Sequence, residues 1–113
     1  MILTLRSPAA LRGGLVLGAL LLAGAGGSAH AADAAAGQKV AERWCASCHV
    51  VTAQQERAQS DAPSFAAIAA GTANLSAPWL AFRLLKPHPQ MPQVSLTQAE
   101  AENLAAYFAS LKK

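Results

Sequence analysis

The sequence predicts a small all-α domain. Four segments repeat apolar residues at helical spacing, and no segment alternates apolar and polar residues as a strand does. The chain has 113 residues, a length that suits one small domain. A third observation concerns chemistry: both cysteines of the chain lie within "WCASCHV", residues 44–50. Two cysteines so close together in a helical domain indicate one chemical site.

Residues 1–31 are expected to be a secretory signal peptide. Arg6 and Arg12 give the segment a basic start, and an apolar run follows at residues 13–25. Residues 29–31 read "AHA", an A-x-A cleavage pattern, so we expect cleavage after residue 31 and export to the periplasm of a Gram-negative bacterium. The alternative is an uncleaved membrane anchor, for which the apolar run is short.

Removal of the signal changes the charge balance of the chain. The full sequence has 9 basic and 6 acidic residues, and two of the basic ones, Arg6 and Arg12, belong to the signal. The mature domain, residues 32–113, is therefore close to neutral, and the basic balance of the full sequence does not indicate nucleic-acid binding. So small a domain rarely stabilises itself with side chains alone, and a large buried cofactor would help to hold it together.

The first helix is predicted from about Asp33 to Ser47, with Asp33 as its N-cap. Its apolar face comprises Gly37, Val40, Ala41 and Trp44. A polar loop, residues 49–62, has few apolar residues and is expected to be exposed.

A short second helix is predicted at residues 64–70, after Pro63, with Phe65 and Ile68 pointing inward. The third, from about Ser76 to Leu85, stops before Pro87. Its shared apolar face comprises Trp79, Phe82 and Leu85.

The stretch "KPHPQMPQ", residues 86–93, contains three prolines and must be extended and stiff. The last helix begins with a capping box, Thr97 to Glu100. An apolar stripe then follows at helical spacing: Ala101, Leu104, Ala105, Phe108 and Leu111.

Cys45, Cys48 and His49 form the C-x-x-C-H pattern of c-type haem attachment. Each thiol would form a thioether to the haem, and the imidazole that follows would be an axial ligand of the iron. The alternatives are a disulfide, a zinc site and a dithiol oxidoreductase. A zinc site needs a fourth ligand, and a thioredoxin-like dithiol needs a βαβ pattern that this sequence lacks.

Met91 is the methionine of the mature domain and lies between Pro89 and Pro92. A methionine often fills gaps in a core. A stiff, proline-flanked segment is better suited to hold a thioether against an iron, so Met91 is the expected second axial ligand. His88, three residues earlier, is the rival ligand.

These residues together resemble those of class I bacterial cytochromes c, small monohaem proteins, over nearly all of residues 33–113. Gly37 stands eight residues before Cys45, "APSF" at residues 62–65 resembles the family's Gly-Pro-x-Leu segment, and "LAAYF" at residues 104–108 resembles its last helix. The resemblance implies crossing N- and C-terminal helices wrapped around one covalently bound haem c.

The resemblance also implies that the carbonyl of Pro63 accepts a hydrogen bond from His49, fixing the tautomer of that ring. Ala41 departs from the family, which often has an aromatic residue at the helix crossing. Trp44 is a candidate to compensate for that loss.

A haem with both axial positions filled indicates an electron carrier and not an enzyme. Redox protein partners would dock weakly at the exposed haem edge, as in other redox encounters, and the carrier would be a monomer. Membrane association would come only through partners or an uncleaved signal. A haem-based gas or redox sensor, and a cytochrome subunit of a periplasmic dehydrogenase or oxidase complex, are the alternative functions.

Overall fold

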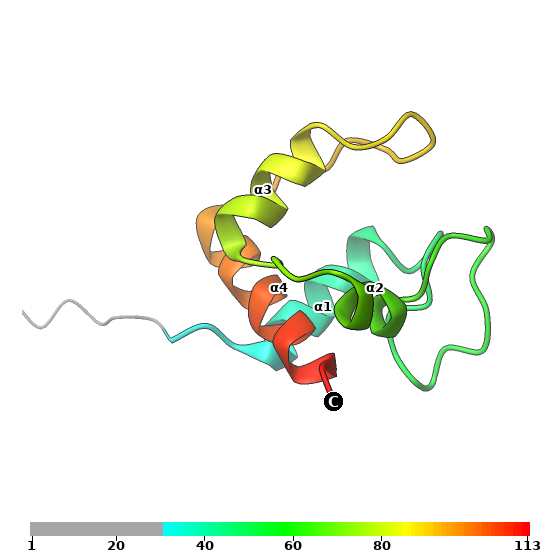
Figure 1. Ribbon diagram of the computed structural model, residues 1–113, viewed down its shortest axis with the longest axis horizontal. Helices are drawn as coiled ribbons and strands as arrows, with labels where there is room; N and C mark the ends of the chain where they lie inside the picture. Colours follow the sequence, from blue (N-terminus) through cyan, green and yellow to red (C-terminus); the bar gives the residue numbers. More distant parts are fainter. Residues whose placement is uncertain (1–30) are drawn as a thin grey trace, which may run out of the picture. The chain divides into compact units, whose positions relative to one another are not determined.

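The computed structural model describes residues 31–113 (Figure 1). The predicted signal peptide, residues 1–31, lies outside the described residues except for its last residue. The described part is all-helical and contains no strand. Its four helices are α1 (Ala34–Trp44), α2 (Phe65–Gly71), α3 (Ala77–Leu85) and α4 (Gln98–Leu111). The predicted fold class is therefore confirmed.

The last helix, α4, is the centre of the packing. Each of α1, α2 and α3 packs against α4, and within residues 31–113 these three helices do not pack against one another. In Figure 1 the orange-red α4 accordingly runs among the other three. Three residues of α4 supply much of the core: Leu104, Tyr107 and Phe108.

The crossing of α1 and α4 depends on small residues of α1. A Cβ atom added to Gly37 would overlap the backbone carbonyl of Asn103 and lie 2.9 Å from the Cβ of Tyr107. Ala41, one turn later, has no exposed surface. Because neither residue has a large side chain, the two helix backbones approach closely. The expected crossing of the N- and C-terminal helices is thus present.

Side chains at the helix starts satisfy backbone N–H groups that have no partner within the helix. The Asp33 carboxylate accepts from the N–H groups of Ala35 and Ala36, and the Asp33 N–H donates to the side-chain oxygen of Asn103, 2.8 Å away. Thr97 and Glu100 form the predicted capping box of α4. The bond between Asp33 and Asn103 ties the start of α1 to α4, although these two residues are far apart in sequence.

The first helix ends at Trp44, three residues before the predicted end. The N–H groups of Cys45 and Ala46 both bond to the carbonyl of Ala41, four and five residues earlier, so the ladder of helical bonds widens and ends there. The N–H groups of Cys48 and His49 then both bond to the carbonyl of Cys45. The C-x-x-C-H segment is therefore a compact turn after α1 and not a continuation of the helix.

The predicted apolar face of α3 is not its buried face. Leu80 and Leu84, one turn apart, are buried, whereas Phe82 is 60% and Leu85 45% exposed. Trp79 is partly buried against the core. Spacing of i and i+4 places both leucines on the side that meets α4.

Aromatic rings connect the core to the motif. Phe65 stacks on Phe108 with ring centroids 4.5 Å apart, and its ring meets the imidazole of His49 edge-on at 5.7 Å. Phe65 thus points inward as predicted, and Ile68 is partly buried against the same core. Among residues 31–113, no helix has the length and apolar character needed to cross a bilayer.

Candidate haem site

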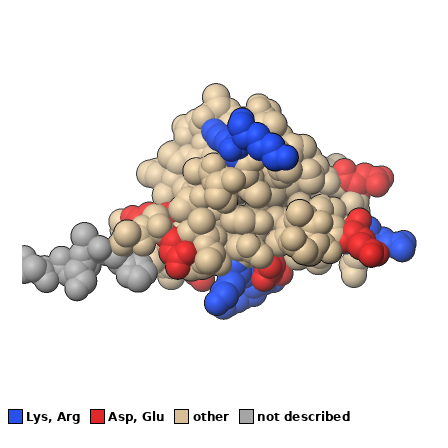
Figure 2. Space-filling view, turned by 90° about the horizontal axis from the view of Figure 1, so that it is seen from below, with Lys and Arg blue, Asp and Glu red and all other residues tan. Residues whose placement is uncertain are grey.

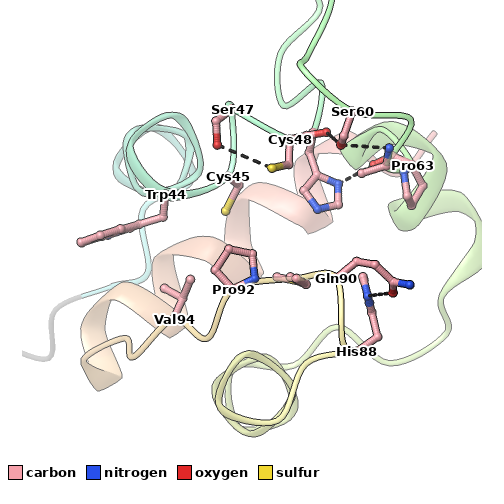
Figure 3. Close-up of a pocket in the computed structure, with 13 residues that line it drawn as sticks. Trp44, Cys45, Ser47, Cys48, Ser60, Pro63, His88, Gln90, Pro92 and Val94 are labelled. Carbon is pink, nitrogen blue, oxygen red and sulfur yellow. Dashed lines mark hydrogen bonds between the residues drawn. The ribbon is translucent and has the colours of Figure 1, made fainter.

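The C-x-x-C-H turn and the proline-rich stretch enclose a cavity of about 280 Å³. Figure 3 shows Cys45 and Cys48 on one side of this cavity and His88, Gln90 and Pro92 on the other. None of the lining residues is Lys, Arg, Asp or Glu. They are Trp44, Cys45, Ser47, Cys48, His49, Ser60, Ala62, Pro63, His88, Gln90, Met91, Pro92 and Val94.

The two cysteines are free thiols that line the same cavity. Burial and, to a lesser extent, the nearby Cys48 raise the pKa of Cys45 to about 11. The thiol of Cys45 therefore stays protonated at neutral pH in this apolar surrounding. Cys48 is less buried, and its sulfur lies 3.7 Å from the hydroxyl of Ser47. Both sulfurs are available for thioether bonds to a group in the cavity.

His49 is buried, with 8% of its surface exposed, and is held through one ring nitrogen. Its Nδ1 lies 2.6 Å from the carbonyl oxygen of Pro63. Since a carbonyl only accepts, Nδ1 carries the proton and donates it, which leaves the lone pair of the neutral ring on Nε2. This is the contact that the family resemblance implies, and it leaves Nε2 available to bind a metal.

The loop that follows the motif is not simply exposed, contrary to the prediction. Val51 is almost fully buried, and its carbonyl accepts a hydrogen bond from the hydroxyl of Tyr107 on α4. The half-buried Gln55 bonds through its amide to the N–H of Val51 and to the carbonyls of Ala46 and His49. Polar side chains therefore anchor this segment where apolar residues are few.

Every carbonyl from Cys45 to Val51 accepts a hydrogen bond from the protein. The partners, in chain order, are the Cys48 and His49 N–H groups, the Gln55 amide, the Gln59 N–H, the Ser60 hydroxyl, the Gln55 amide again, the Phe65 N–H and the Tyr107 hydroxyl. A turn in which all carbonyls are bound has little freedom to rearrange. These bonds, most of them from residues 55–65, thus hold the backbone of the motif in one conformation.

Two backbone bonds hold the opposite wall. The N–H of Met91 donates to the carbonyl of His88 over 3.0 Å, and the N–H of Val94 donates to the carbonyl of Leu84 at the end of α3 over 3.0 Å. Met91 is partly buried and packs against the core, whereas His88 is exposed. The His88 Nδ1 lies 3.3 Å from the side-chain oxygen of Gln90.

All the residues proposed from the sequence therefore border one cavity. Cys45, Cys48, His49 and Pro63 line it, and so does Met91 from the proline-rich stretch. The rival ligand His88 also borders the cavity. Sequence reasoning missed Gln55 and the hydrogen bond of the Tyr107 hydroxyl, because a single Gln in a polar loop and the polar end of one Tyr carry no recognisable pattern.

Other candidate sites in the described residues lack this chemistry. Residues 31–113 contain no group of three or more His, Cys, Asp or Glu side chains arranged to hold a metal ion, which is what the zinc alternative requires. A hollow beside the C-terminal ends of α2 and α4 is lined by Ala, Gly, Thr, Leu and Lys and offers no ligand for iron or zinc.

An all-helical domain with a C-x-x-C-H turn beside a cavity defines a c-type haem protein. The chain belongs to the cytochrome c family, whose model matches residues 34–112. The cytochrome c-552 of Bradyrhizobium diazoefficiens is 50% identical over 93 residues, which cover 82% of this chain and 88% of that protein. No solved structure matches the chain significantly.

Membership of this family identifies the cofactor as one covalently attached haem c and the protein as a monohaem electron carrier. The residues present fit that cofactor. Two free thiols and the free Nε2 of an oriented imidazole border the same cavity, whose lining is mostly apolar and uncharged.

Proposed function

We propose that the protein is an exported cytochrome that carries single electrons between periplasmic or membrane redox partners. In this proposal Cys45 and Cys48 form the thioethers, and His49 and Met91 are the axial ligands of the iron. The observation that carries it is that His49 and Met91 both line one cavity, with the His49 ring already oriented by Pro63.

The two proposed ligands are held in different ways. The carbonyl of Pro63 accepts a hydrogen bond from the Nδ1–H of His49, which fixes the ring and makes Nε2 a better donor to a metal. The backbone bonds at Met91 and Val94 limit the movement of the facing segment and so reduce the entropy lost when a thioether is held in place. When bound, the haem supplies a one-electron ferric–ferrous couple, whose potential a Met ligand raises.

Two filled axial positions leave no open coordination site for a substrate, which supports a carrier and not an enzyme. We propose export because the sequence of residues 1–31 has the features of a cleavable signal.

Partners of this carrier would dock at the cavity mouth, where the lining is uncharged. On the face seen in Figure 2, charged side chains form a few separate groups of both signs and most of the surface is uncharged. Such a surface gives little long-range steering, so we expect weak, short-lived encounters that depend little on salt. We further propose that the carrier is a monomer and does not bind nucleic acid.

An optical spectrum scanned into the near infrared tests the ligand assignment. The protein would be produced in a host that attaches c-type haem, and the ferric form examined for the sulfur-to-iron charge-transfer band. We expect this band in the parent protein, its loss in Met91→Ala, and its retention in the matched control His88→Ala. A parent spectrum of a covalent haem without the band would remove Met91 as ligand, and loss of low-spin character in His88→Ala would assign that role to His88.

A further inference from the structure

The side chain of Gln55 makes more hydrogen bonds than any other in the segment that follows the haem-attachment motif. Its Nε2 lies 2.9 Å from the carbonyl of Ala46, 3.0 Å from that of His49 and 3.2 Å from that of Arg57. Its Oε1 lies 2.9 Å from the N–H of Val51. Only an amide side chain offers two donors and an acceptor in this arrangement.

The orientation of this amide follows from its neighbours. Three carbonyl oxygens surround one end, and a carbonyl accepts but never donates, so that end must be the NH₂ group. The opposite end faces a backbone N–H and must be the oxygen. With the ends exchanged, all four contacts would be repulsive.

Gln55 and Pro63 act on different parts of His49. Pro63 fixes rotation of the imidazole through Nδ1, whereas Gln55 binds the backbone carbonyl of His49 itself. The second donor of Gln55 reaches Ala46, which lies between the two cysteines. One side chain therefore clamps the motif at its start and at its histidine.

The clamp is connected to the core of the fold. Gln55 accepts from the N–H of Val51, whose carbonyl accepts from the Tyr107 hydroxyl on α4. Val51 is itself almost fully buried. Through Val51, the position of Gln55 is thus fixed relative to α4, the helix on which the other three pack.

We infer that Gln55 is a positioning residue for the proximal side of the haem: it sets the backbone of His49 and thereby the orientation of the axial imidazole. This inference rests on the proposed function, in which His49 is the axial ligand, and adds a residue outside the motif to the ligand-setting machinery. It concerns the His49 side of the iron and is independent of which residue binds the other side.

Gln55→Glu and Gln55→Ala test this inference, with Gln98→Ala as the matched control. Glutamate keeps the shape and the acceptor of glutamine but has no N–H to donate to Ala46 and His49 at neutral pH. Alanine removes all four contacts. Gln98 also makes a side-chain hydrogen bond, to Glu102, but lies on the exposed surface of α4 far from the motif in sequence.

The readouts are the g-values of the ferric protein by electron paramagnetic resonance, its hyperfine-shifted proton spectrum, and the midpoint potential. The first two respond to the orientation of the axial imidazole, which a purely structural role would leave unchanged. We expect both Gln55 variants to keep covalent haem but to shift the g-values, the order of the shifted resonances and the potential, while Gln98→Ala matches the parent in all three.

Gln55→Ala and Gln55→Glu proteins with lower melting temperatures but with parental g-values, proton spectra and potential would overturn the inference. If Gln55→Ala fails to accumulate, the near-isosteric Gln55→Glu decides by the same readouts. Failure of the proposed function is visible separately in the optical spectrum of the parent protein, as the absence of a covalently held low-spin haem or, for the Met91 side alone, as a missing sulfur-to-iron band.

Discussion

Gly37 on α1 lies so close to the backbone carbonyl of Asn103 on α4 that no side chain fits between them. The carbonyl belongs to the backbone of a helix and cannot move aside as a flexible side chain could. The closest approach of the N- and C-terminal helices is therefore set by the absence of a Cβ atom at one position.

The first prediction is that Gly37→Ala destabilises the protein. The added methyl group would overlap the Asn103 carbonyl and press on the Cβ of Tyr107, and such overpacking costs about 1–3 kcal/mol. The matched control is Gly71→Ala at the end of α2, where an added Cβ meets nothing within 4 Å. We expect that control to be neutral or to stabilise by up to about 1 kcal/mol. Thermal unfolding of both variants measures the difference, and equal melting temperatures would contradict this view of the crossing.

The second prediction separates the two faces of α3. Leu80 is buried, so Leu80→Ala should cost about 2–5 kcal/mol. Phe82 is 60% exposed and contacts the Lys86 ammonium, 5.5 Å from the ring centroid. Loss of so exposed a contact should cost less than about 1 kcal/mol. Denaturant unfolding of Leu80→Ala and Phe82→Ala shows which substitution lowers the free energy of unfolding more. A larger loss for Phe82→Ala would mean that the buried face of α3 is the one predicted from the sequence.

The third prediction concerns alkaline pH. Burial raises the pKa of the Tyr107 phenol, and the negative charge of Glu42 raises it further. A group whose pKa is higher in the folded state contributes stability that is complete below its unfolded pKa of about 10 and is lost as pH rises through the folded pKa. Tyr107→Phe removes this dependence, and it should cost about 1–3 kcal/mol at neutral pH because the buried Val51 carbonyl loses its donor.

Unfolding free energies from pH 7 upward test the role of Tyr107. The parent should lose stability faster than Tyr107→Phe above pH of about 10. Parallel curves for the two proteins would show that the phenol does not govern alkaline unfolding. Ser110→Ala is a control on the same helix, since its hydroxyl bonds only to the carbonyl of Tyr107.

The fourth prediction concerns acid pH and the start of α4. Hydrogen bonds from the backbone N–H and then from the side chain of Thr97 lower the pKa of Glu100. A lowered pKa gives stability that is present above the unfolded value of about 4.3 and is lost as pH falls through the folded value. Glu100→Gln keeps a capping-box residue without the charge. Its stability should therefore fall less steeply below pH 5 than that of the parent.

Thr97→Ala completes this test. It removes the cap itself and should cost about 0.5–2 kcal/mol at neutral pH, whereas Glu100→Gln should cost less. Helix content by circular dichroism between pH 2 and 7 reports on both. An identical acid transition in the parent and Glu100→Gln would assign the acid sensitivity to other carboxylates.

Much of the fold could be predicted from the sequence, because strong local signals coincide with it. The capping box at Thr97 fixed the start of the last helix, and Gly37 with the apolar stripe of that helix indicated the crossing. The motif at Cys45 to His49 located the cavity, and the proline-flanked Met91 indicated a second segment that lines it.

The errors have physical reasons. The nine residues of α3 include apolar side chains on several sides, so spacing alone did not distinguish the face of Leu80 from that of Phe82. The loop after the motif is held by one amide, two hydroxyl groups and backbone groups, and such bonds leave no periodic pattern in a sequence. Val51 is a single buried residue in that loop and gave no signal of its own.

The central position of α4 has a consequence for how the chain acquires its fold. A growing or translocating chain emerges from its amino end, so α1, α2 and α3 are released before the 14-residue helix on which all three pack. The pairing of Asp33 with Asn103 closes a loop of 70 residues, and such distant contacts raise the contact order and slow folding. The first three helices therefore have no helix to dock on until the last one arrives, and a ribosome-bound chain that ends before Thr97 should remain open to proteases.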